Sequence, residues 1–127
     1  MFNKLDETFV KEGAQNITEK DVEKVVSKSE EIKKKFGTTG PLSRFIEDGQ
    51  LLLSVVKDYW SGAYRQIPYG TIASIVFTLI YVLNPFDLVP DMLPLIGQID
   101  DVAVMGACLL FVEQDLHKYK EWKQGQA

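Results

Sequence analysis

Four aspartates near the middle of the chain are the residues whose type and spacing could do chemistry. Asp87, Asp91 and the pair Asp100–Asp101 have apolar neighbours, and no basic residue lies beside them in the sequence. Carboxylates that are brought together in apolar surroundings must gain partners, because otherwise burial raises their pKa values. The segment that contains these four residues is therefore the first candidate site.

Three interpretations of the aspartates are open. In the first, which we favour, Asp87 and Asp100 or Asp101 cap helix N-termini by accepting backbone hydrogen bonds, where the helix dipole also stabilises them. In the second, the carboxylates pair with a cation from an earlier helix, and the candidates are Arg65, Arg44 and Lys57. In the third, Asp87, Asp91, Asp100 and Asp101 together bind Mg²⁺ or Ca²⁺, which take oxygen ligands. Their spacing matches no EF-hand loop.

An enzymatic role has little support elsewhere in the chain. Paired carboxylates can serve as acid and base in phosphoryl or glycosyl hydrolysis. The single histidine, His117, lies among charged residues and is expected on the surface near a helix end. The single cysteine, Cys108, lies in an apolar run and is expected to be a small buried side chain. A carboxylate-dependent hydrolase is therefore the last hypothesis, and we expect a protein that is not an enzyme.

Composition indicates one folded domain. The chain has 127 residues, of which 46% are hydrophobic and 25% are charged, so it can form a core and is not disordered. Its formal net charge of -4 argues against nucleic-acid partners, which require a basic face. The first residues mix charges with apolar side chains, so we expect no secretory signal peptide and a start in the cytoplasm.

The elements that must position the aspartates are helices. Apolar residues recur at helical spacing from Thr18, whose capping box with Asp21 starts a helix that ends at Gly37. A second helix, with a wide apolar stripe, is expected from Pro41 to about Gly62. Tyr69–Leu83 is almost entirely apolar and ends at Asn84-Pro85. The last helix opens at Asp100-Asp101, is apolar through Val112 and is charged beyond it.

These patterns predict an all-α fold, a small bundle of about four main helices. The bundle is built around an apolar helical hairpin, Tyr69–Val112, with a Pro- and Asp-rich turn. Residues 1–127 form a single domain, divided into an amphipathic N-terminal helical region (1–40), a second amphipathic helix (41–66), the apolar hairpin core (67–112) and a charged C-terminal helix end (113–127).

The apolar hairpin raises the question of a membrane. At about 1.5 Å per residue, Tyr69–Leu83 covers roughly 22 Å against a hydrocarbon core of roughly 30 Å, so a transmembrane helix does not follow from length alone. No Lys or Arg lies between Arg65 and Lys118, and basic residues flank both sides. If the hairpin enters a bilayer, both chain ends are therefore cytoplasmic. Five aromatic residues lie where interfacial side chains are expected, namely Trp60, Tyr64, Tyr69, Tyr119 and Trp122.

The motif also resembles a known family. Residues 81–91 read Y-V-L-N-P-F-D-L-V-P-D, and Pro94, Gly97 and Asp100-Asp101 follow. This resembles the YkvA-like bacterial domain of unknown function, whose pattern is roughly Y-x-x-x-P-x-D-L-I-P-D, then P-x-x-G and D-D. The resemblance covers about residues 67–110 and implies no activity. Its members are commonly described as membrane-associated, which implies the same association here by analogy.

We therefore expect a non-enzymatic, membrane-associated helical protein with cytoplasmic termini. The alternative is a soluble cytoplasmic binding module whose aspartate-rich turn holds a divalent cation or a basic partner. A protein partner or a homo-oligomer is compatible with both.

The favoured capping interpretation makes a prediction. Each single Asp→Ala change at Asp87, Asp100 or Asp101 should lower the free energy of unfolding by about 0.5–2 kcal/mol, because a cap is removed. Calorimetric titration with Mg²⁺, Ca²⁺ and Mn²⁺ should give no binding heat. Heat that disappears in the same variants would favour the cation site instead.

Overall fold

The computed structural model describes residues 4–37, 40, 42–83 and 101–125, and all regular elements in these ranges are helical. The predicted all-α fold class is confirmed. The α-helices are α1 (Lys4–Ala14), α2 (Glu19–Ser27), α3 (Ser29–Phe36), α4 (Ile46–Ser61), α5 (Tyr69–Leu83), α7 (Asp101–Phe111) and α8 (Glu113–Gly125), and a 3₁₀ turn, η1 (Ser43–Phe45), precedes α4.

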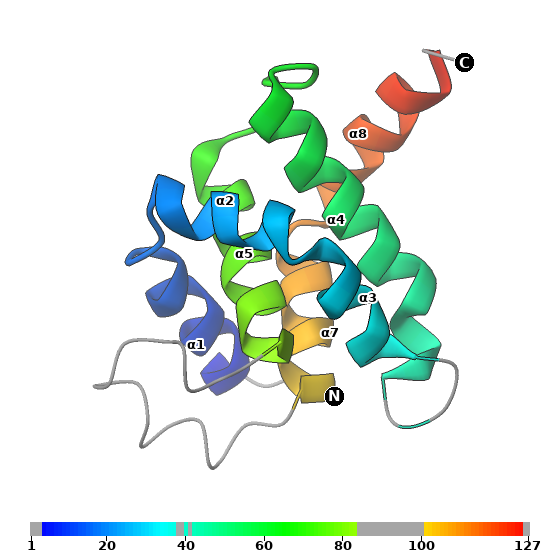
Figure 1. Ribbon diagram of the computed structural model, residues 1–127. Helices are drawn as coiled ribbons and strands as arrows, with labels where there is room; N and C mark the ends of the chain where they lie inside the picture. The colour runs from blue at the N-terminus through cyan, green and yellow to red at the C-terminus, as the bar shows by residue number, and fades with distance from the viewer. Residues whose placement is uncertain (1–3, 38–39, 41, 84–100, 126–127) are drawn as a thin grey trace.

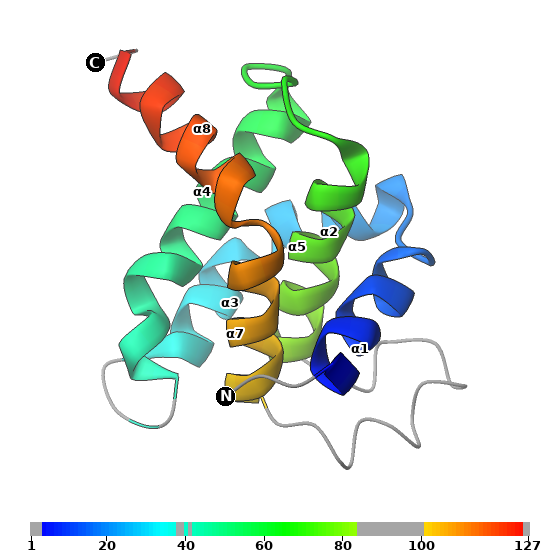
Figure 2. The same ribbon diagram turned by 180° about the vertical axis from the view of Figure 1, so that it is seen from behind.

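Helix α5 lies at the centre of the bundle. All side chains from Thr71 to Val82 are buried. Helices α1, α2, α3, α4 and α7 all contact α5 and enclose it from different sides (Figures 1 and 2). A helix that is apolar on every side requires such cover, because any uncovered side would expose apolar surface to water. The first arm of the predicted hairpin, which is α5, is therefore surrounded by other helices of the protein.

The few polar side chains of α5 are satisfied inside the bundle. Ser74 and Thr78 each donate a hydrogen bond of 2.9 Å to the carbonyl four residues earlier in the helix. Thr71 instead donates to the Asp115 carboxylate of α8, at 2.6 Å. In the described part of the chain, no buried side-chain nitrogen or oxygen lacks a partner. These residues therefore add no unpaired polar group to the core.

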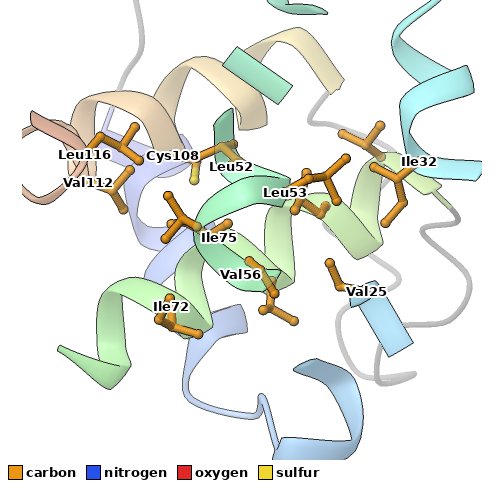
Figure 3. Close-up of a cluster of buried hydrophobic side chains, with 14 of the residues drawn as sticks. Val25, Ile32, Leu52, Leu53, Val56, Ile72, Ile75, Cys108, Val112 and Leu116 are labelled. Carbon is orange, nitrogen blue, oxygen red and sulfur yellow. The ribbon is translucent and has the colours of Figure 1, made fainter. Parts of the chain in front are cut away.

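The main core forms where the other helices meet α5. In Figure 3, side chains from six helices point toward one another; the labelled ones are Val25, Ile32, Leu52, Leu53, Val56, Ile72, Ile75, Cys108, Val112 and Leu116. A smaller cluster lies between α1, α5 and α7 and contains Phe9, Val10, Phe77, Tyr81, Val104 and Ala107. Each fully buried Val, Leu, Ile or Phe contributes about 1.5–3 kcal/mol relative to an exposed one.

Helix ends follow the sequence signals. The Asp21 carboxylate accepts hydrogen bonds from the Thr18 backbone N–H at 2.9 Å and from the Thr18 hydroxyl at 3.2 Å, which confirms the predicted capping interaction. Gly37 ends α3 with φ 57°, and Gly62 ends α4 with φ 88°. Both angles lie in the region that glycine adopts at little cost, so both glycines stop their helices as predicted.

Two of the predicted helices are bent. The predicted helix from Thr18 to Phe36 is α2 and α3, which join at Lys28, and the predicted last helix is α7 and α8, which join at Val112. Backbone hydrogen bonds continue through both joints, since Ile32 N–H donates to Lys28 C=O at 3.0 Å and Leu116 N–H to Val112 C=O at 2.9 Å. Figure 2 shows α8 turning away from the line of α7 toward α4.

The second predicted helix starts later than expected. Helix α4 begins at Ile46 after the tighter η1 turn, whereas a start at Pro41 was predicted. Pro41 itself lies outside the described residues. Among the described residues, no helix combines the length and the hydropathy needed to cross a membrane.

The close packing of α1 on α5 gives a stability prediction. A Cβ on the buried Gly13 would overlap the ring of Phe77, which is itself fixed by an edge-on contact with Phe9 at 5.3 Å between ring centroids. Gly13→Ala should therefore lower the free energy of unfolding by about 1–3 kcal/mol, as overpacking does. Gly70→Ala is the control, because its Cβ meets nothing within 4 Å. In urea unfolding, equal stability of the two variants would contradict the close approach.

Candidate functional site

Most of the predicted acidic site lies outside the described residues. Asp87, Asp91 and Asp100 fall within residues 84–100, and of Asp101 only its place as the first residue of α7 is described. The capping, ion-pair and cation interpretations of these aspartates therefore stay predictions. Among the described residues, no group of three or more His, Cys, Asp or Glu side chains could hold a metal ion.

Arg65, a predicted partner of the aspartates, lies against an aromatic ring. Its guanidinium carbon is 4.5 Å from the ring centroid of Tyr59, a cation–π contact. Arg65 precedes the start of α5, whereas the acidic turn follows its end at Leu83. At 1.5 Å per residue, α5 separates these two points by about 22 Å. The ion pair between Arg65 and the turn stays a prediction, and the contact with Tyr59 was not foreseen.

A groove runs between the start of α4 and the outer sides of α7 and α8. Its volume is about 680 Å³, which is within the range of small-molecule sites. Its floor is apolar and includes Phe45, Leu51, Val102, Leu109 and Leu116. Its rim carries both signs of charge and consists of Arg44, Asp48, Glu113, His117 and Lys120. His117 is exposed, as predicted.

Two large apolar side chains stay exposed where α7 ends. Leu110 is 54% exposed and lines the groove, and its neighbour Phe111 is 46% exposed. The Lys11 ammonium of α1 lies 5.3 Å from the centroid of the Phe111 ring. We call Leu110 and Phe111 the α7 edge. It joins apolar surface, an aromatic ring and a nearby cation, a combination typical of surfaces that meet lipid headgroups.

A cluster of polar side chains, which we call the polar latch, joins α8 to α4. It consists of Ser54, Asp58, Tyr119 and Lys123. The fully buried Tyr119 donates its phenolic hydrogen to Asp58 Oδ2 at 2.5 Å, and its oxygen lies 2.5 Å from Ser54 Oγ. Lys123 Nζ lies 2.9 Å from the same carboxylate oxygen. Burial raises the pKa of Asp58, but the hydrogen bonds from Tyr119 and Lys123 outweigh it and hold that pKa below its ordinary value. The latch therefore stabilises the ionised carboxylate.

The positions of the aromatic residues correct the prediction that all five lie where a membrane interface would be. Tyr64 and Tyr119 are buried rather than at a surface, and they pack edge-on at 5.1 Å between centroids, with Trp122 beside them. Tyr119 can be buried because its hydroxyl finds partners on α4. Trp60 and Tyr69 do stay exposed, at 39% and 41%. The available sequence signal was the spacing of four residues between Ser54 and Asp58, and between Tyr119 and Lys123, which puts each pair on one helix face.

Cys108 is buried, as predicted. Its Sγ lies 3.8 Å from the carbonyl oxygen of Ser74, to which it donates. Burial raises the pKa of this thiol to about 12. Because the thiolate is the reactive form, Cys108 is an inert core residue.

The latch gives a pH-dependent prediction. Because folding lowers the pKa of Asp58 below 3.8, its contribution to stability is complete above that pH and is lost as pH falls through the folded-state pKa. Asp58→Asn should lower the free energy of unfolding at pH 7 by about 1–3 kcal/mol. The difference from the unmodified protein should shrink below pH 4 in urea titrations. Glu47→Gln, an exposed carboxylate of the same helix, is the control and should change stability by less than about 0.5 kcal/mol.

Comparison with known proteins supports the resemblance given by the motif. Residues 71–107, which run from α5 into α7, match the model of a family described as a protein of unknown function (DUF1232). Over 69 residues the chain is 28% identical to a protein of Bacillus subtilis (strain 168) described as "Uncharacterized membrane protein YkvA". That match covers 54% of this chain and 65% of the relative. No solved structure matches the chain. These two matches support a YkvA-like domain of unknown function in this chain.

Proposed function

We propose that this is a non-enzymatic, membrane-associated helical protein that contacts the bilayer surface through the α7 edge. The observation that carries the proposal is the exposure of Leu110 and Phe111 beside Lys11, at the border of the apolar groove. The description of the Bacillus subtilis relative as a membrane protein supports it. The proposed side is the cytoplasmic face, where both chain ends are expected.

Insertion of α5 itself into the bilayer would cost more free energy than a contact made at the surface of the bundle. Its side chains from Thr71 to Val82 are already enclosed by five other helices. To expose α5 to lipid, those helices would have to separate and leave their own buried side chains uncovered. Each such side chain costs about 1.5–3 kcal/mol when exposed to water. A contact made by residues that are exposed in the folded bundle avoids this cost.

The α7 edge suits shallow insertion. Leu110 and Phe111 can enter the boundary between headgroups and acyl chains, while Lys11 remains among the headgroups. Two partly exposed side chains bury little area, so the binding is weak and reversible. The formal net charge of -4 opposes strongly anionic surfaces, so the apolar contact supplies most of the affinity.

Sedimentation with lipid vesicles tests the proposal. The purified full chain should co-sediment with vesicles of phosphatidylethanolamine and phosphatidylglycerol. The double variant Leu110→Ser/Phe111→Ser should weaken the partition coefficient about tenfold, because two inserted side chains are removed.

The matched control replaces the two other large exposed aromatics. Trp60→Ser/Tyr69→Ser removes similar exposed fractions at another part of the surface, and should retain most of the binding. Circular dichroism confirms that each variant is folded. Recovery of the unmodified protein entirely in the supernatant at every lipid concentration would contradict the proposal, as would equal losses in both double variants.

A further inference from the structure

A second hollow lies between α3, α4 and α8, on a different side of α4 from the groove. Its volume is about 430 Å³. Its polar lining comes from three helices and consists of Lys33, Gln50, Ser54, Lys57, Asp58 and Lys123. The family match at residues 71–107 includes none of these residues.

Positive charge exceeds negative charge in this hollow. Three lysines face one carboxylate, and that carboxylate already accepts hydrogen bonds from Tyr119 and Lys123. Lys33 makes an exposed contact of 3.5 Å with Glu30, which is worth little. Lys57 is half-buried and has no ion-pair partner among the residues that the structure describes. The residues that line the hollow therefore carry an excess of two positive charges, within a chain of net charge -4.

The hydrogen-bond pattern specifies which groups can bind an anion. The phenolic hydrogen of Tyr119 goes to Asp58, so the short contact between Ser54 and Tyr119 uses the hydrogen of Ser54. Ser54 thus has no hydrogen left to donate to a ligand. The lysine ammonium groups and the exposed Gln50 amide remain as donors.

We propose that this hollow binds a doubly charged phosphate group, carried by a small phosphorylated molecule or by a lipid headgroup. A compact dianion matches the excess of two charges and relieves the repulsion between the lysines. Lysine binds phosphate as a point charge and needs no planar geometry. The volume leaves room for the group to which the phosphate is attached. A nucleic acid fits poorly, because it requires an extended basic face rather than one hollow.

Two binding experiments separate the two sources of phosphate. Calorimetric titration of the full chain with pyrophosphate tests a soluble ligand. Sedimentation with phosphatidylcholine vesicles, with and without phosphatidic acid, tests a headgroup, since phosphatidic acid carries a phosphate monoester. The measured quantity is the increase in binding caused by phosphatidic acid.

Lys57→Gln is the test variant and Lys34→Gln the matched control. Both remove one positive charge, but Lys34 lies on the exposed side of α3 and does not line the hollow. Lys57→Gln should weaken the binding of pyrophosphate, or remove the gain from phosphatidic acid, about tenfold. Lys34→Gln should change either by less than about twofold. Equal melting temperatures show that both variants are folded.

Each outcome decides the proposal. Lys57-dependent binding of pyrophosphate, of phosphatidic acid or of both supports it and identifies the source. No binding of either by the unmodified protein overturns it, as do equal losses in Lys57→Gln and Lys34→Gln. The Leu110→Ser/Phe111→Ser variant should still bind pyrophosphate, so this proposal stands or fails independently of the membrane contact at the α7 edge.

Discussion

The need to cover α5 determines the arrangement of the described helices. A helix with a buried apolar surface on every side cannot be protected by one partner, and α7 covers one side of it only. Helices α1 to α4 supply the remaining cover. Gly13 of α1 serves the same purpose, because its lack of a side chain lets α1 approach the Phe77 ring closely.

The bends at Lys28 and Val112 follow from the same requirement. A straight helix touches a central helix over a few turns only, whereas a bent one can redirect its apolar side. The bend at Lys28 lets both α2 and α3 contact α5. The bend at Val112 takes α8 away from the α7 direction, so that Tyr119 reaches Asp58 of α4.

Sequence patterns predicted the local features well and the long-range ones poorly. Helix type, the Thr18 capping interaction and the stops at Gly37 and Gly62 depend on neighbouring residues, and these predictions are confirmed.

The bends carry no proline or glycine, so periodicity gave no sign of them. The Tyr119–Asp58 latch joins residues 61 positions apart, and the lysine hollow needs three helices. The latch and the hollow both depend on tertiary packing, which the sequence patterns alone do not reveal. The aspartate turn stays a prediction.

The central position of α5 also bears on what a family match means. Residues 71–107 include the whole buried stretch of α5, so the matched residues that the structure describes are largely interior. An interior specifies how helices assemble and leaves open what their outer faces recognise. The groove rim, the latch and the lysine hollow draw mainly on α3, α4 and α8, outside the matched residues. Proteins that share this interior can therefore present unrelated surfaces, and the surfaces must be compared one protein at a time.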